Sequence, residues 1–264
     1  MTRQYISPTR LAAMADELSG RERDVLLTLA NVRLASADQL ERLHFASDTS
    51  RNRRRILLSM TDRRLVVRLD RVIGGQRAGS AAFCYGLGEV GQRVLASTQG
   101  WPRRRPSNPG APFVRHCLAI TELLVRLTEA TRKSDVELLE FSAEPLAWRR
   151  FLGRGGSRAI LKPDAFVRIG VGEFVDSWFV EVDLGTESPS TLTTKLDAYR
   201  AYWSTGKETA RNGVFPRVLW LAPDERRAEV IIDCCGRQPA DSWMLHQVTL
   251  IDDGPDLMAG GQSS

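Results

Sequence analysis

Three carboxylates at strand-like positions are the residues of this chain best suited to chemistry. Asp164 follows Pro163 in an apolar run, and Glu181 and Asp183 lie two residues apart in Trp178-Phe-Val-Glu-Val-Asp-Leu. Side chains alternate across a strand, so Glu181 and Asp183 are expected to share one face. Carboxylates that are buried together repel one another and need a proton or a cation. Because oxygen ligands suit Mg²⁺ or Mn²⁺, the three residues predict a divalent-metal site.

A lysine on the next helical segment completes this predicted site. Lys195, Tyr199 and Tyr202 recur at i, i+4 and i+7, so they share a helix face that can turn toward the carboxylates. The alternative is structural, with Arg168 or backbone amides satisfying the carboxylates in an ordinary ion-pair network.

The residues around the predicted site, 113–254, indicate an α/β domain with a central mixed sheet. Helices are expected at 114–131, 190–204 and 224–235, and strands at 136–141, 159–169, 178–184, 217–222 and 244–250. Glu122, on the first helix, is expected to be a solvated surface residue. Residues 255–264, which end in Ala-Gly-Gly-Gln-Ser-Ser, are expected to form a disordered tail.

Residues 1–97 predict a winged helix-turn-helix domain that binds DNA. Apolar residues recur at helical spacing in 19–32, 36–45 and 48–65, and two hairpin strands follow around a glycine-rich turn. In such a domain the third helix enters the major groove and the wing contacts the flanking phosphates. The expected DNA-binding residues are Arg51, Asn52, Arg53, Arg54, Arg55, Arg68, Arg71 and Arg77.

The charges of the two halves of the chain support a DNA-binding first domain and a separate second domain. Residues 1–112 hold 19 Arg and no Lys against 10 Asp and Glu, whereas residues 113–264 hold 18 basic against 22 acidic residues. A basic half indicates a module that binds a polyanion. The alternative is a winged helix used for dimerisation or protein contact, with its arginines solvated. Between the halves, residues 98–112 contain four prolines and a tri-arginine run and predict a linker.

Composition excludes several other classes of protein. The 264 residues are 42% hydrophobic and 26% charged, which is typical of a folded chain. No run of about 18 apolar residues occurs, which excludes a membrane span, and the first residues lack the apolar region of a secretory signal. A cytoplasmic location is therefore expected. The three His and four Cys are scattered without a C-x-x-C pair, which excludes a zinc finger and a relaxase with a histidine cluster.

The motifs of the second half resemble the core of PD-(D/E)xK nucleases. Pro163-Asp164 and Glu181 match the metal-holding positions of that pattern, and a lysine-bearing helix follows. The pattern places its lysine two residues after the glutamate, where this chain has Asp183. The resemblance therefore implies either that Lys195 takes over the role of that lysine or that the site has lost cleavage.

From about Leu18 to about Leu250, the chain also resembles the plasmid replication-relaxation family of bacterial mobile elements. The most specific part is the stretch from Glu181 to Glu187, Glu-Val-Asp-Leu-Gly-Thr-Glu, with Lys195 and Tyr199 downstream. This resemblance implies a DNA-binding protein acting in replication or relaxation, either with a Mg²⁺- or Mn²⁺-dependent nuclease or as a non-catalytic regulator. Double-stranded DNA is the expected partner, together with a second copy of the chain or with replication or mobilisation proteins.

Overall fold

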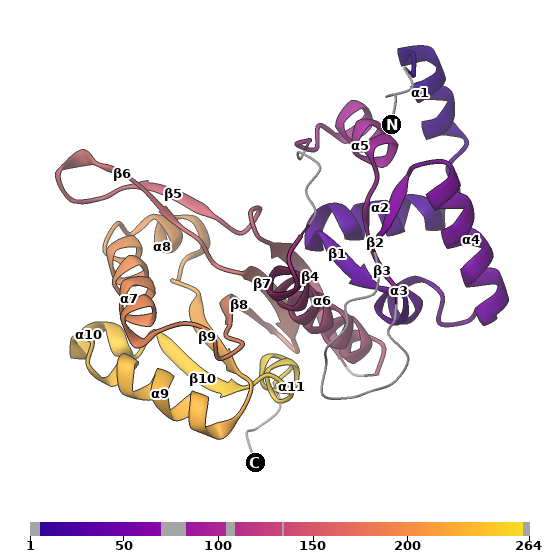
Figure 1. Ribbon diagram of the computed structural model, residues 1–264. Helices are drawn as coiled ribbons and strands as arrows, with labels where there is room; N and C mark the ends of the chain where they lie inside the picture. The colour runs from indigo at the N-terminus through magenta and orange to yellow at the C-terminus, as the bar shows by residue number, and fades with distance from the viewer. Residues whose placement is uncertain (1–5, 70–82, 104–108, 134, 261–264) are drawn as a thin grey trace. The chain divides into compact units, whose positions relative to one another are not determined.

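In a computed structural model the chain divides into two units, residues 1–125 and 126–264 (Figure 1). The structure describes residues 6–69, 83–103, 109–133 and 135–260. Arg71 and Arg77, predicted for the wing, and Arg104 and Arg105 of the predicted linker lie outside these ranges. The division falls between Val125 and Arg126, inside a helix, whereas the sequence placed the linker at 98–112.

Unit 1 combines helices with a three-stranded antiparallel sheet in the order β1-β3-β2. Its elements are α1 (Pro8–Asp16), α2 (Gly20–Val32), β1 (Leu34–Ser36), α3 (Ala37–His44), α4 (Ser50–Asp62), β2 (Val66–Leu69), β3 (Cys84–Leu87), α5 (Glu89–Gln99) and the larger part of α6 (Ala111–Thr131). Fully buried aliphatic side chains from α2, α3 and α4, among them Leu26, Leu40 and Met60, form the core of the unit. The three predicted helices and the two hairpin strands are thus present.

Local capping chemistry fixes where the helices of unit 1 begin. The predicted capping box of α2 is confirmed, since Ser19 Oγ accepts from the Glu22 backbone N–H at 3.2 Å and Glu22 Oε2 accepts from the Ser19 N–H at 3.0 Å. Ser36 and Gln39 form a second box at the start of α3. Thr49 caps α4 through a hydrogen bond from the Asn52 N–H.

The first part of α6 belongs to unit 1 because it packs on the sheet there. Thr121, which is fully buried, donates its hydroxyl hydrogen to the carbonyl oxygen of Leu34 at 2.7 Å. Val114 and Cys117 share a buried cluster with Leu34 and Cys84. These contacts explain why the division of the chain lies beyond the proline-rich segment and within the helix.

The backbone after α4 lies so close to the start of α5 that Gly88 and Gly91 have no room for a side chain. The Gly88 N–H donates to the Leu65 carbonyl at 2.9 Å, and the Val90 N–H donates to the Arg64 carbonyl at 3.1 Å. A Cβ atom at Gly88 would collide with the Arg64 carbonyl oxygen, and one at Gly91 would collide with that of Leu65. Only glycine permits so close an approach between these backbones.

Unit 2 is built on a mixed five-stranded sheet in the order β10-β9-β8-β7-β4, which confirms the predicted central sheet. Its strands β4, β7 and β8 pair antiparallel, whereas β8, β9 and β10 pair parallel. The strands are β4 (Val136–Ala143), β7 (Ala165–Val171), β8 (Phe174–Val182), β9 (Arg217–Ala222) and β10 (His246–Leu250), and a separate hairpin consists of β5 (Arg149–Leu152) and β6 (Arg158–Leu161). The helices are α7 (Pro189–Trp203), α8 (Lys207–Asn212), α9 (Glu225–Gly236), α10 (Ala240–Trp243) and α11 (Gly254–Met258).

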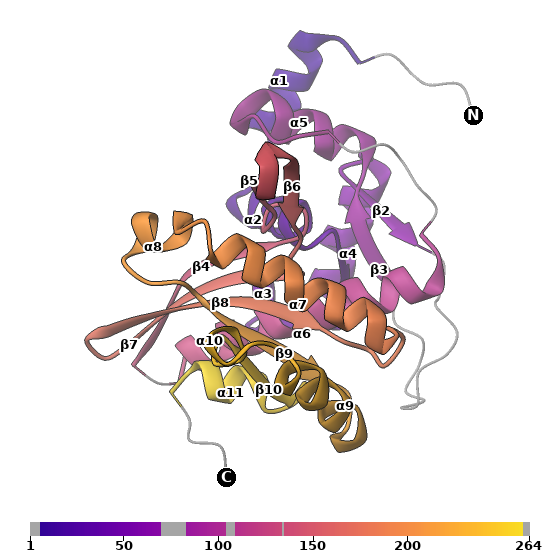
Figure 2. The ribbon, with the colours of Figure 1, turned by 90° about the vertical axis from the view of Figure 1, so that its left-hand side faces the viewer.

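Helices α7 and α9 cover one face of this sheet, and Figure 2 shows α7 lying along that face. Leu196 and Tyr199 of α7 and Ile231 of α9 pack there against Phe179 and Trp220, which are fully buried. Because side chains alternate along a strand, Glu181 lies on the same face as Phe179, beneath α7. The candidate acidic site is therefore built between the sheet and this helix layer.

Two predictions for unit 2 were wrong in part. The expected strand over 159–169 is two strands, β6 and β7, which are interrupted at Lys162–Asp164 because Pro163 has no N–H to donate to a ladder. The expected tail from residue 255 begins instead as α11, in which Pro255 and Met258 are buried. Met258 anchors this turn, although the polar composition around it favoured disorder.

Candidate functional site: a buried acidic cluster and a basic helix

The antiparallel pairing of β7 and β8 sets Asp164 opposite Glu181. Ala165 pairs with Val180, so the residue before it and the residue after its partner face each other on the same side of the sheet. Backbone hydrogen bonds continue this register, since the Asp164 N–H donates to the Val180 carbonyl at 3.0 Å. Asp164 Oδ2 in turn accepts from the Val182 N–H at 2.8 Å. The structure thus brings together two of the three predicted carboxylates.

Two side chains of α7 bind Glu181, of which only 1% is exposed. Lys195 Nζ lies 2.9 Å from Glu181 Oε2, and the Tyr199 hydroxyl donates to Oε1 at 2.6 Å. Lys195 Nζ also lies 2.8 Å from Oε1 of Glu187, in the loop that leads to α7. Of the predicted helix face, Lys195 and Tyr199 therefore contact the carboxylates, whereas the Tyr202 hydroxyl donates to Glu208 at 2.8 Å.

The electrostatics of this cluster favour a shared proton or an added cation. The pKa of Glu181 is raised to about 7, because burial and the charge of Asp164 together outweigh the lowering effect of Lys195 and Tyr199. Burial alone would lower the pKa of Lys195, but the neighbouring carboxylates, Glu181 first, outweigh burial and raise it. Lys195 is therefore held as an ammonium ion against the carboxylates, and the pKa of Tyr199 is raised by burial and by Glu181.

Asp183 is bound by a different residue and stands apart from this cluster. Arg227 of α9 forms a two-pronged ion pair with it, with Nε 3.0 Å from Oδ1 and Nη2 2.6 Å from Oδ2. The Gly185 N–H also donates to Oδ1, at 2.5 Å, and Arg227 Nη2 donates to the Glu187 carbonyl at 2.8 Å. Arginine–carboxylate forks of this kind are strong and directional. Arg227 was missed by sequence reasoning, which named Arg168 as the candidate partner.

Of the three carboxylates predicted as metal ligands, Asp164 and Glu181 face each other, whereas Asp183 is bound by Arg227. Within the described ranges, no group of three or more His, Cys, Asp and Glu side chains is arranged to hold a metal ion. Mg²⁺, however, is commonly held by one or two carboxylates together with substrate phosphates. A carboxylate has about four lone-pair positions, so Glu181 can accept from Lys195 and Tyr199 and still offer an oxygen. The two facing carboxylates fit such an ion, whereas Asp183, occupied by Arg227, does not.

In unit 1, the basic residues predicted to contact DNA divide into exposed and paired groups. Arg51, Arg54 and Arg55 are exposed on α4. Arg53 instead forms an ion pair with Glu41 of α3. Asn52 donates to Asp48 Oδ1 at 2.8 Å and accepts from Arg55 at 2.9 Å, so it forms part of the polar surface at the start of the helix.

Two further side chains of unit 1 have partners within the same unit. Arg68 of β2 is exposed, and its guanidinium stacks 4.3 Å from the ring centroid of Phe83. Glu122 is not a solvated surface residue as expected, since Arg42 Nη1 donates to it at 2.6 Å and Gln39 Nε2 donates to it at 3.0 Å. A glutamate of α6 thus helps to fix α3.

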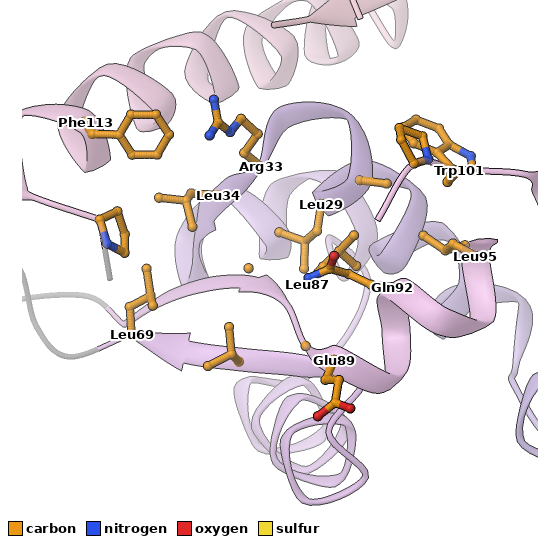
Figure 3. A pocket seen from close by; sticks show the side chains of 16 residues that line it. Leu29, Arg33, Leu34, Leu69, Leu87, Glu89, Gln92, Leu95, Trp101 and Phe113 are labelled. Carbon is orange, nitrogen blue, oxygen red and sulfur yellow. The ribbon is translucent and has the colours of Figure 1, made fainter. Parts of the chain in front are cut away.

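An apolar cavity of about 530 Å³ lies in unit 1 and was not predicted. Figure 3 shows Leu29, Leu87 and Leu95 around it, with Trp101 at one end and Phe113 at the other. Its polar members already have partners, because Arg33 stacks 4.4 Å from the Phe113 ring centroid and Glu89 pairs with Arg64 at 2.7 Å. The cavity-lining residues come from segments far apart in sequence, so no local pattern could reveal them.

A comparison with protein families gives a match to the replication-relaxation model over residues 26–218. The chain belongs to the replication-relaxation family. The match begins within α2 and ends at the start of β9, so it includes both α4 and the acidic cluster of this family member. Searches of curated proteins and of solved structures gave no match. Among the helices of the described residues, none has the length and apolar character that crossing a membrane requires.

Proposed function

We propose that this replication-relaxation protein binds double-stranded DNA through α4, in the replication of a plasmid or another mobile element. The observation that carries the proposal is the exposed stripe of Arg51, Arg54 and Arg55, at i, i+3 and i+4 of one helix. Few acidic residues balance these charges, since the first turn of α4 contains none. A row of guanidinium groups on a helix surface suits the phosphates that border a major groove.

The order of elements in unit 1 supports a winged-helix arrangement for this contact. Helices α2, α3 and α4 precede the antiparallel strands β2 and β3, with β1 as the third strand of the sheet. In such domains the third helix enters the groove. Arg68 on β2 extends the basic surface toward the hairpin, where phosphate contacts of a wing are expected.

Binding by α4 is tested with the variant Arg51→Ala/Arg54→Ala/Arg55→Ala on a duplex of fixed sequence. We expect the slope of log K against log salt concentration to become shallower by about 2 to 3, because each lost phosphate contact removes about 0.9. The matched control replaces three other exposed arginines of unit 1, Arg10, Arg23 and Arg115. An equal change in the control, or an unchanged slope in the α4 variant, would refute α4 as the contact.

A second candidate function, divalent-metal-dependent DNA cleavage in unit 2, is favoured by the convergence of Asp164, Glu181 and Lys195. Asp164 and Glu181 would hold Mg²⁺ or Mn²⁺, and the ion would supply an activated water and charge neutralisation at the phosphate. Lys195 would stay protonated and bind a phosphoryl oxygen, since the carboxylates raise its pKa. Tyr199 would keep Glu181 oriented through its 2.6 Å hydrogen bond.

Cleavage is tested by incubating supercoiled plasmid with the full chain and Mg²⁺ or Mn²⁺. Nicking that needs the metal and is lost in Asp164→Asn and Glu181→Gln would support the enzyme. Asp233→Asn, at an exposed position of α9, is the control and should nick as the parent does. Intact DNA alongside normal binding would leave the non-catalytic regulator as the function.

A further inference from the structure

The β5–β6 hairpin is a basic projection on an acidic unit. Residues 126–264 hold 17 Lys and Arg against 21 Asp and Glu, yet the stretch from Leu146 to Pro163 contains five basic residues and no acidic one. The hairpin pairs only with itself as a two-stranded sheet, and in Figure 1 it extends away from the five-stranded sheet of its unit. Sequence reasoning assigned it no function.

The register of the hairpin puts Arg150 and Arg158 on one face. Arg150 pairs with Ile160, and Leu152 pairs with Arg158, so these four side chains point to the same side. All four are exposed. Lys162, which continues this face beyond β6, is also exposed and stacks 5.1 Å from the Trp148 ring centroid. This outer face of the hairpin thus alternates three cations with apolar side chains.

The opposite face of the hairpin anchors it to unit 2. The Phe151 ring lies 5.1 Å from that of Tyr202 on α7. Arg149 Nε lies 2.9 Å from Oε1 of the buried Glu208, and its guanidinium stacks 4.6 Å from the Phe166 ring centroid. The outer face is therefore presented on a fixed base, since Arg149 and Phe151 of the opposite face make these contacts to the rest of the unit.

We propose that the outer face of the β5–β6 hairpin binds the sugar–phosphate backbone of duplex DNA, as a contact separate from α4. The inference rests on the proposed DNA-binding function and adds a site in the second unit. From Arg158 to Lys162 the strand covers about 13 Å, at about 3.3 Å per residue. Measured along the helix axis, that length corresponds to about four phosphates of one DNA strand.

The residue types of this face favour DNA over a protein partner. A two-stranded β-ribbon has the width to enter a DNA groove. Leu152, which is 62% exposed, and Ile160, which is 40% exposed, stand between the arginines rather than in one apolar patch. Aliphatic side chains so placed can contact deoxyribose or a base step while the guanidinium groups bind phosphates. A protein interface would instead concentrate its apolar side chains at a centre.

The test is the full-length variant Arg150→Ala/Arg158→Ala/Lys162→Ala in a salt titration of duplex binding. We expect at least about tenfold weaker binding at moderate salt and a slope of log K against log salt that is shallower by about 2 to 3. The control, Arg211→Ala/Arg226→Ala/Arg237→Ala, removes three other exposed cations of unit 2 and should bind as the parent chain does. Arg149, Phe151 and Leu161 stay unchanged, and thermal unfolding checks that the variant is folded.

The α4 variant, measured in parallel, separates failure of this proposal from failure of the proposed function. A hairpin variant that binds DNA like its control, while the α4 variant loses binding, overturns the hairpin site and leaves the DNA-binding function standing. Loss of self-association in the hairpin variant without any loss of DNA binding also overturns it, because the face would then serve a second copy. If the parent chain binds no duplex at all, both proposals fall.

Discussion

Replacing Lys195 by Met should destabilise the protein in a manner that depends on pH. Met keeps most of the apolar stem of lysine but leaves Glu181 and Asp164, of which 1% and 7% are exposed, without their cation. Removing one partner of a buried ion pair costs about 3 to 5 kcal/mol. Because 29% of the Lys195 side chain is exposed, solvent screening reduces this, and we expect a loss of about 3 kcal/mol at pH 8.

The sign of the pH effect follows from the raised pKa of Glu181. A carboxyl whose pKa is about 7 in the folded state and about 4.5 when unfolded contributes stability below pH 4.5 that is lost as the pH rises through 7. Without Lys195 the folded pKa should rise further. At pH 5 the variant therefore keeps Glu181 protonated, and the expected loss falls to about 1 kcal/mol.

Urea unfolding at pH 5 and pH 8, followed by tryptophan fluorescence, to which the buried Trp178 and Trp220 contribute, measures both values. Lys207→Met, at an exposed position of α8, is the control and should change stability by less than about 0.5 kcal/mol at either pH. Added Mg²⁺ should raise the stability of the Lys195→Met variant if the two carboxylates hold the ion. Equal losses at pH 5 and pH 8 would refute the coupling of Lys195 to Glu181.

Three further outcomes are expected. His246, whose pKa burial lowers to about 4, accepts the Trp220 indole hydrogen at Nδ1 over 3.2 Å, so its stabilising effect is present above pH 6.5 and is lost as the pH falls toward 4. The free energy of unfolding should therefore differ between pH 7 and pH 5 by about 2 kcal/mol less in His246→Gln than in the parent protein. The same pH dependence in both proteins would contradict this. Thr121→Val should cost about 1 to 2 kcal/mol in urea unfolding because it leaves the buried Leu34 carbonyl without its hydroxyl donor, whereas Thr121→Ser should cost less. Asp183→Asn should lower the free energy of unfolding by about 3 kcal/mol, since Arg227 keeps a half-buried charge without a counterion, and an unchanged midpoint would exclude a stabilising pair.

Features that depend on neighbours in sequence could be predicted. The capping box of Ser19 and Glu22 lies within four residues, and the stripe of Arg51, Arg54 and Arg55 follows from helical periodicity. The shared face of Lys195 and Tyr199 was likewise visible, because it needs only a regular helix that follows the strand of Glu181.

Features that depend on distant segments could not be predicted. Asp183 and Arg227 lie 44 residues apart, and Arg227 was one of many arginines with no local mark of its role. Arg53 pairs with Glu41 of another helix. Because this contact depends on tertiary structure, the sequence around Arg53 does not distinguish it from the exposed arginines beside it. Strand β6 fell within the strand expected over 159–169, but β5 and the hairpin were not predicted, because the outer face mixes charged and apolar residues and lacks the clean alternation of a half-buried strand.

The glycines at the junction of α4 and α5 also bear on how this family member can vary. Gly88 and Gly91 touch the backbone of the turn after α4 so closely that any larger residue would have to separate the two helices. Gly88 and Gly91 should therefore tolerate no substitution in a saturation-mutagenesis screen, although glycine has no polar side chain that could bind a ligand. If variants at Gly88 and Gly91 are lost from such a screen together with variants of the α4 arginines, the glycines are needed for folding and not for binding DNA. A purified Gly88→Ala protein would then unfold at a lower temperature than an arginine variant.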